Sequence, residues 1–285
     1  AYPGTPSTEI TEYIQGHPLA AARGVHRTWS SNEKTAVEEA LGMSFAGKRA
    51  LVCMKHVGMN VAADAFVNSA MTGANGGLVV VAADDPSMHS SQNEQDSRFY
   101  GKFALVPTFE PSTQQEAYDM AKAAFELSER FRIPVLMRLT TRMAHSRAVV
   151  EVTEPRAENE LHAPADTRRW VLMPGNSRVR YKGLLDDYAR LEEAAAASPF
   201  NAYAEGPDKR LGIIACGIAH NYVMENYPDG CPHPVLKLSQ YPLPRDLVRR
   251  MASECQALLV VEEGQPVVEE AVRGVLPGPL PIRGR

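Results

Sequence analysis

The stretch ALVCMKHVGMNVAADAFVNSAM, residues 50–71, decides the fold of the first half of the chain. Residues 50–54 form a short apolar run, typical of a strand buried inside a parallel sheet. Residues 61–71 predict a helix, and residues 55–60 predict a loop in which Gly58 gives the backbone freedom to turn. A strand, a loop and a helix in this order form the repeating unit of a parallel α/β sheet.

The same alternation continues on both sides of this stretch. Thr5 as a cap, with Pro6 at the first helical position, predicts a helix over residues 5–15. Further helices are expected at 31–46, 93–102 and, from a capping-box pattern at 112–115, up to residue 131; further strands are expected at 78–82 and 133–139. In open α/β sheets, ligands bind beyond the carboxyl ends of the strands, where the polar loops of this chain are expected.

The pattern changes twice further along the chain. Residues 151–208 are charged, proline-containing and alanine-rich, and predict a connector with one helix at 182–197. Strands at 211–216, 235–238 and 257–262, alternating with helices from 219, at 245–253 and at 267–275, predict a second α/β unit. We therefore expect an α/β protein with a first domain at 1–150, a connector at 151–208 and a smaller second domain at 209–285.

Composition excludes several classes of protein. A formal net charge of -4 gives no basic surface for nucleic acid, and the longest apolar runs are far shorter than the roughly 20 residues of a membrane helix. The four cysteines stand singly, which predicts reduced cysteines in a cytoplasmic protein and no zinc or iron–sulfur site within this chain. The chain begins at Ala1 without a methionine or a signal peptide, so we expect it to be a segment of a longer protein.

Two polar features stand at the expected ligand edge. Glu33 follows Ser31 and Asn32 at the start of a helix, where an acidic residue stabilises the helix dipole whether or not it also has a function. The loop at 55–60 brings Lys55 and His56 together with Gly58, which fits either a ligand site or an ordinary loop histidine.

Arg98 lies on the expected short helix after the polar stretch DDPSMHSSQNEQDSR, residues 84–98. Its guanidinium has the shape to bind a substrate carboxylate, but an ion pair with a neighbouring acid is an alternative. Motifs of dinucleotide-binding proteins, P-loop proteins, serine hydrolases and zinc proteases are missing from the sequence. His145, His162 and His233 have no ligand-like spacing and are assigned no role.

Five motifs together resemble one enzyme family: YPGTPS (2–7), SSNEKTA (30–36), MKHVGMNVAAD (54–64), the stretch at 84–98 and LVVEE (259–263). They resemble the aminopyrimidine-binding part of thiamine-diphosphate-dependent 2-oxoacid:ferredoxin oxidoreductases. The MKHVG motif favours the alpha subunit of the indolepyruvate branch. The resemblance implies an α/β aminopyrimidine-binding domain followed by a smaller domain similar to the transketolase C-terminal domain. It also implies oxidative decarboxylation of an aryl pyruvate, such as indolepyruvate, with coenzyme A and ferredoxin.

The resemblance also implies roles for individual residues. Glu33 matches the carboxylate that bonds the aminopyrimidine ring nitrogen of thiamine diphosphate, the one catalytic role expected here. Thr5 and Arg98 match substrate-binding residues. Lys55, His56, Gly58 and Asn60 match a loop that lines the cleft.

The sequence departs from the family pattern in two respects. The Gly-Asp-Gly pattern that holds the diphosphate with magnesium and the clustered cysteines of the iron–sulfur centres are both missing from this chain. The resemblance therefore implies a half-site, inactive by itself, that acts with its missing part, a beta subunit and an oligomeric assembly. Alternatives are another 2-oxoacid oxidoreductase, a transketolase-like enzyme, or a noncatalytic α/β assembly module.

Overall fold

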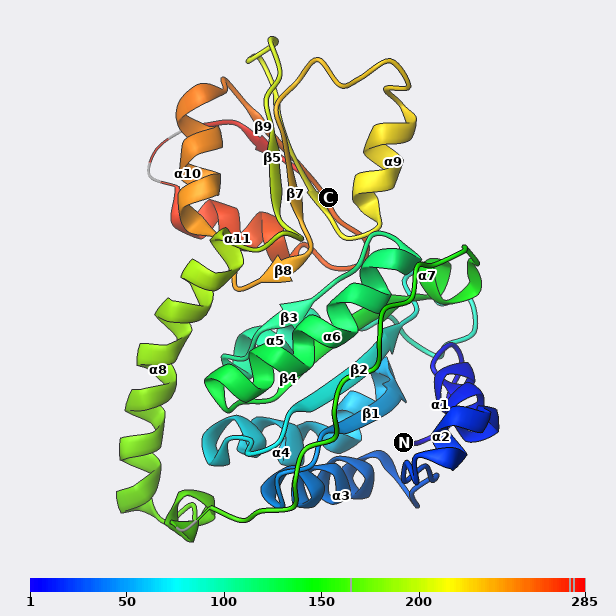
Figure 1. Cartoon of the computed structure of the whole chain (residues 1–285). Coiled ribbons are helices and arrows are strands. Elements are labelled where there is room, and N and C mark those ends of the chain that lie inside the picture. Colours follow the sequence, from blue (N-terminus) through cyan, green and yellow to red (C-terminus); the bar gives the residue numbers. More distant parts are fainter. Residues whose placement is uncertain (165, 277, 279, 285) are drawn as a thin grey trace.

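The computed structural model, which describes residues 1–164, 166–276, 278 and 280–284, contains two five-stranded sheets (Figure 1). The first sheet has the order β1 (Ala50–Lys55), β2 (Leu78–Asp84), β4 (Val135–Thr140), β3 (Thr108–Phe109) and β8 (Gln240–Tyr241). Its helices are α1 (Thr8–Gly16), α2 (Pro18–Ala22), α3 (Glu33–Phe45), α4 (His56–Thr72), α5 (Arg98–Ala104), α6 (Gln114–Phe131) and α7 (Thr141–His145).

The second sheet has the order β10 (Ile282–Arg283), β9 (Leu258–Val261), β6 (Gly212–Cys216), β7 (Val235–Leu238) and β5 (Ala202–Ala204). Its helices are α9 (Ala219–Glu225), α10 (Arg245–Glu254) and α11 (Val267–Val275). A 3-10 turn at Thr167–Trp170 and the long helix α8 (Pro174–Ala196) connect the two units (Figure 1). The expected two-unit α/β fold is therefore confirmed.

The centre of the first sheet is parallel and completely buried. β2 pairs in parallel with β1 on one side and with β4 on the other, and all seven of its residues are buried. This burial on both faces explains why its sequence is apolar without alternation. Because β1, β2 and β4 run the same way, their carboxyl ends meet at one edge of the sheet.

The helix α3 begins close to its predicted start. Asn32 is the N-cap, and its side chain accepts a hydrogen bond from the backbone nitrogen of Thr35 at 3.0 Å. The helix ends at Phe45, and Gly47 follows with a φ of +90°, a backbone conformation that favours glycine. α3 packs against α4, which fixes Glu33 beside the start of α4.

Several helix starts differ from the predictions. α1 begins at Thr8, because residues 5–7 form a turn before the chain enters the helix. α4 begins at His56, so the predicted loop at 55–60 is wrong: the chain passes from β1 directly into the helix, and Gly58 is helical. The short helix expected at 93–102 begins later, at Arg98.

The sheets also cross the predicted domain boundaries. β5 lies within the predicted connector but pairs with β7 of the second sheet. β8 lies within the predicted second unit but pairs antiparallel with β3, so that Tyr241 stands opposite Thr108 of the first sheet. Strands of two or three residues carry no alternation pattern, which explains why the sequence did not predict them.

The start of the predicted connector is hydrogen-bonded to the first unit. The backbone nitrogen of Glu151 donates to the side chain of Gln115 at 2.7 Å, and Arg49 donates to the carbonyl of Ala157 at 2.9 Å. The backbone nitrogen of His162 donates to the carbonyl of Ala46 at 2.9 Å. This segment therefore belongs to the surface of the first unit (Figure 1).

Candidate functional site

Four segments meet at the carboxyl edge of the first sheet, as the sequence predicts. A side chain at Gly4 would lie 3.0 Å from Cβ of Lys55, which places the N-terminal turn against the end of β1. Lys55 Nζ donates to the carbonyl of Ser90 at 3.0 Å, and His56 Nε2 lies 3.2 Å from the carbonyl oxygen of Asn93. These contacts hold the polar stretch at 84–98 next to the start of α4.

Glu33 is buried without a partner at this edge. Its residue is 9% exposed, and its carboxylate makes no hydrogen bond or ion pair with any residue that the structure describes. A Cβ atom at Gly58 would lie 2.6 Å from Cγ of Glu33 and 2.7 Å from its Oε1, so a larger residue there would displace the Glu33 side chain. The oxygens of this carboxylate are not among the fully shielded side-chain atoms of the described residues, so Glu33 can bind a partner from outside the chain.

The arrangement of Glu33 fits the aminopyrimidine ring of thiamine diphosphate. A carboxyl oxygen can share a proton with a ring nitrogen, and the N-terminus of α3 places unpaired backbone amides near the carboxylate. Its neighbour Lys34 leaves Glu33 free because Nζ of Lys34 pairs with Asp64 at 2.9 Å.

The other residues predicted to line the cleft take different positions. His56 is fully buried, and its Nδ1 has no hydrogen-bond partner among the described residues, so it stands behind the surface. Lys55 is half-buried and held by the carbonyl of Ser90. Asn60 is exposed and accepts a hydrogen bond from the hydroxyl of Tyr100 on α5.

Thr5 lines a pocket of about 470 Å³ at the same edge. The described residues that line it are Thr5, His89, Ser90, Thr141, Arg142 and His145. Three of these side chains are cationic or can become so, and this lining contains no carboxylate. The pocket is therefore suited to an anion.

Asp85 supports the wall of this pocket. It is 1% exposed, and its carboxylate accepts hydrogen bonds from the hydroxyls of Ser91 at 2.5 Å and Thr141 at 2.7 Å and from the backbone nitrogen of Ser90 at 2.8 Å. Burial acts to raise the pKa of Asp85, but the hydrogen bonds from Ser91, Ser90 and Thr141 outweigh it and hold that pKa well below its usual range. Its charge is thus satisfied within the loop.

Arg98 has a different environment from the one its predicted role requires. It lies at the carboxyl end of β2, where the backbone nitrogen of Ser97 donates to Asp84 at 2.9 Å. Its side chain is only 2% exposed; Nε donates to Asp96 at 2.9 Å and Nη1 pairs with Glu262 at 2.9 Å. A guanidinium bound to acids of its own chain is poorly placed for a substrate, so this position argues against the predicted substrate-binding role.

Sequence reasoning missed Arg142 and His145. Both come from α7, which follows the last residue of β4 directly. The signal was present, because polar residues at the carboxyl end of a predicted parallel strand are candidates for a site. Sequence reasoning assigns His145 no role because it lacks metal-ligand spacing. That criterion does not test for an anion site.

Among the described residues, no group of three or more His, Cys, Asp or Glu side chains is arranged to hold a metal ion. No helix in the same part of the chain combines the length and the apolar character needed to cross a membrane.

Two relatives match almost all of the chain, and a third matches about half of it. It is 45% identical to indolepyruvate oxidoreductase subunit IorA of Archaeoglobus fulgidus, over 96% of this chain and 45% of that protein, and 45% identical to IorA of Pyrococcus abyssi, over 96% and 43%. It is 26% identical to 2-oxoglutarate synthase subunit KorA of Methanothermobacter thermautotrophicus, over 54% of this chain and 42% of that protein. The chain thus spans less than half the length of these relatives.

The fold also has a solved counterpart. The structure of a 2-oxoglutarate:ferredoxin oxidoreductase from Magnetococcus marinus, with 2-oxoglutarate, coenzyme A and succinyl-CoA bound, superimposes with a TM-score of 0.77. It covers 99% of this chain and 57% of that chain at 14% identity, so the likeness concerns the fold alone. Residues 1–182 match the family model of the pyruvate flavodoxin/ferredoxin oxidoreductase, thiamine diphosphate-binding domain. Because that match covers more than half of its length and includes Glu33 and Gly58, the chain belongs to the thiamine-diphosphate-binding family of pyruvate flavodoxin/ferredoxin oxidoreductases.

Proposed function

We propose that this chain supplies the aminopyrimidine half-site of an indolepyruvate-type 2-oxoacid:ferredoxin oxidoreductase. The observation that carries the proposal is Glu33, a carboxylate buried against Gly58 without a partner among the described residues. The relatives named IorA support indolepyruvate as the substrate. In this proposal the complete enzyme oxidatively decarboxylates aryl pyruvates with coenzyme A, passes the electrons to ferredoxin and works with a beta subunit.

Glu33 holds a proton at the aminopyrimidine ring in this proposal. When bound, thiamine diphosphate supplies a nucleophilic carbon and accepts the electron pair that is released on decarboxylation. Glu33 shares a proton with the ring nitrogen, since its carboxylate has no partner among the described residues that competes for that hydrogen bond. Gly58 allows the close approach, because any larger residue there meets the Glu33 side chain.

The pocket beside Thr5 receives the substrate carboxylate in this proposal. Arg142 and His145 of α7, together with His89, line the same pocket as Thr5, whereas Arg98 is occupied by Asp96 and other acids. Arg142 remains accessible: its side chain is 64% exposed, and Nε lies 3.8 Å from Glu263. A guanidinium with free N–H groups can bind a carboxylate through two parallel hydrogen bonds.

The remaining functions are assigned to parts of the protein outside this chain. The chain spans 43–45% of the length of the IorA relatives. We propose that the diphosphate with its magnesium and the iron–sulfur clusters are held by that remainder, as the missing sequence patterns suggest. This isolated segment is then inactive, and the assembled subunit is the unit to test.

Glu33→Gln in the assembled enzyme tests the central role. Glutamine keeps the size of the side chain but cannot hold the shared proton, so kcat should fall between about a hundredfold and ten-thousandfold. The dissociation constant of thiamine diphosphate, measured by isothermal titration calorimetry, should change far less than kcat. Unchanged turnover would sink the assignment and leave the noncatalytic assembly module as the better reading.

Gly58→Ala provides an independent variant with a matched control. The added methyl group meets the carboxylate and displaces it, so turnover should fall while the helix remains intact. Gly42→Ala makes the same change in α3, where a Cβ meets no atom within 4 Å, and should leave turnover unchanged. Equal behaviour of the two variants would show that the contact between Glu33 and Gly58 has no role.

The match to KorA supports a second candidate, in which the substrate is another 2-oxoacid. A comparison of kcat/KM for indolepyruvate and 2-oxoglutarate decides between the two. We expect the higher value for indolepyruvate, because the IorA relatives match over a larger part of the chain.

A further inference from the structure

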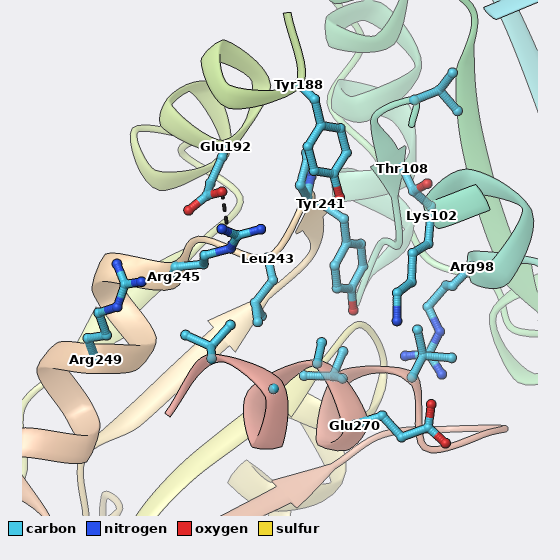
Figure 2. Close-up of a pocket in the computed structure, with 17 residues that line it drawn as sticks. Arg98, Lys102, Thr108, Tyr188, Glu192, Tyr241, Leu243, Arg245, Arg249 and Glu270 are labelled. Carbon is cyan, nitrogen blue, oxygen red and sulfur yellow. Dashed lines mark ion pairs between the residues drawn. The ribbon is translucent and has the colours of Figure 1, made fainter. Parts of the chain in front are cut away.

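A second cavity, of about 440 Å³, lies between the two units of the chain (Figure 2). Residues from α5 and β3 of the first unit, from α8 and β8, and from α10 and α11 of the second unit line it. Its volume falls in the range of small-molecule sites, which occur preferentially at such domain junctions. It is lined by a different set of side chains from the pocket beside Thr5.

One side of this interdomain pocket is apolar. Val268 and Ala271 of α11, Leu243 and the buried Val106 all contribute apolar side chains to its lining. Figure 2 shows the ring of Tyr241 extending toward α11. Such a surface is suited to a flat or bulky apolar group rather than to water.

Among the described residues that line the pocket, the arginines are paired with acids and Lys102 is not. Arg245 pairs with Glu192 at 3.3 Å, and Arg249 pairs with Asp246 at 3.1 Å. Lys102, by contrast, makes no hydrogen bond or ion pair with any described residue, and Figure 2 shows its side chain pointing into the pocket.

The acids that line the pocket do not neutralise Lys102. Glu192 is held by Arg245, and Glu270 forms no ion pair with Lys102. An uncommitted ammonium group beside an apolar wall matches a molecule that carries one acidic group on an apolar body.

We propose that this interdomain pocket binds a small amphipathic anion, with its apolar body against α11 and its acidic group at Lys102. The ligand contacts both units at once: Lys102 belongs to α5, and Val268 and Ala271 belong to α11. Binding therefore stabilises the arrangement of the two units, since a ligand stabilises the state that it binds.

Tyr241 links the pocket to the buried charges behind it. Its ring lines the pocket, and its hydroxyl donates to Glu110 at 2.7 Å. Glu110 forms an ion pair with Arg138, at the centre of the charged cluster between the units. A ligand that contacts Tyr241 is therefore linked through this residue to Glu110 and the charged cluster that joins the two sheets.

The experiment uses 1-anilinonaphthalene-8-sulfonate, a fluorescent amphipathic anion, titrated into the intact protein that contains this chain. We expect saturable binding, with a Kd that rises about tenfold in Lys102→Gln because a charge-assisted hydrogen bond is lost. Lys182→Gln is the matched control, since Lys182 is an exposed lysine of α8 outside the pocket, and it should bind like the wild type. Equal Kd values for the two variants would overturn the proposal.

A second variant fills the pocket without changing Lys102, and a matched variant outside the pocket serves as its control. Gly274 lines the pocket on α11, and a Cβ there meets no atom within 4 Å, so Gly274→Trp adds an indole without a clash at its base. Gly183→Trp makes the same change at an equally open position of α8. The proposal is supported if Gly274→Trp loses the saturable binding and Gly183→Trp keeps it. Binding that survives in Gly274→Trp, or its absence from the wild type, refutes it. Glu33→Gln should not affect this binding, which separates the result from the proposed function.

Discussion

At the scale of single residues, pairing distinguishes a binding group from a structural one. Glu33 and Arg98 are both charged and buried. Glu33 has no partner among the described residues, whereas Arg98 is held by Asp96 and Glu262. A charged group without a partner in the chain can bind a ligand, whereas a charged group that is paired within the chain is already occupied. Arg142 also lies near an acid, Glu263, but its side chain is 64% exposed, so we propose Arg142 rather than Arg98 as the carboxylate site.

We predict that Arg142→Gln in the assembled enzyme raises KM for the 2-oxoacid and leaves kcat nearly unchanged. The lost charge-assisted contact corresponds to an increase in KM of about tenfold to a hundredfold. Arg147→Gln is the control, because Arg147 is an exposed arginine nearby that does not line the pocket. Steady-state kinetics measures both values. An unaltered KM in Arg142→Gln, together with a raised KM in Arg98→Lys, would restore the role that the sequence predicts for Arg98.

At the scale of elements, the start of a helix can be predicted from the sequence where a side chain caps it. α6 begins after Thr113, whose hydroxyl accepts from the backbone nitrogen of Glu116 at 3.1 Å. Glu116 in turn accepts from the backbone nitrogen of Ser112 at 2.9 Å. The capping box therefore involves Thr113 and Glu116, one residue later than the predicted pattern at 112–115. α4 lacks such a signal because Lys55, its N-cap, makes no side-chain cap bond.

We predict that Glu116→Ala lowers the free energy of unfolding by about 1–3 kcal/mol, because the cap and the ion pair with Lys237 are lost together. Burial raises the pKa of Glu116, but the bonds with Lys237 and Ser112 outweigh it and lower that pKa below its usual value of 4.5. A carboxyl group with a depressed pKa stabilises the fold above its unfolded-state pKa and loses this contribution as the pH falls. The difference between the wild type and the variant should therefore shrink below pH 4.5.

Urea denaturation at several pH values measures this difference. Glu12→Ala is the control, since Glu12 is exposed on α1 and has no partner among the described residues. A loss of stability in Glu116→Ala that is the same at all pH values would contradict the ionic contribution.

At the scale of the whole molecule, a buried charged cluster joins the two units. Its members are Asp84, Asp96, Arg98, Glu110, Arg138 and Glu262. Arg138 is fully buried and pairs with Asp84 at 2.6 Å, and its Nη2 donates to the backbone carbonyl of Glu263 in the second unit at 2.8 Å. The orientation of the second unit therefore depends on groups whose charges must remain paired.

We predict that Arg138→Met destabilises the protein by about 3–5 kcal/mol at neutral pH, since it leaves buried carboxylates unpaired. Burial raises the pKa of Asp96, but Arg138 and Arg98 outweigh it and lower that pKa from 3.8 to about 2. The stabilisation from Asp96 is present above pH 3.8 and is lost as the pH falls toward about 2. The variant, without Arg138, should lose less stability than the wild type over this pH range.

Thermal unfolding at neutral and acidic pH measures the effect of Arg138→Met. Arg210→Met is the control, because Arg210 pairs with Asp208 at the surface with its side chain 80% exposed, and it should stay within about 0.5 kcal/mol of the wild type. Equal Tm values for the two variants would show that the cluster does not hold the units together.

The sequence by itself determined the α/β class, the two units and the position of Glu33, because each follows from local pattern. The apolar run of β2 and the cap at Asn32 are readable without knowledge of the fold. Only the tertiary structure decided which charges are paired and which are free. The pairing of Arg98 with Glu262, and the gathering of Arg142 with Thr5 in one pocket, join residues more than a hundred positions apart. Contacts across such separations leave no periodicity in the chain, so only the packing of the two sheets brings these groups together.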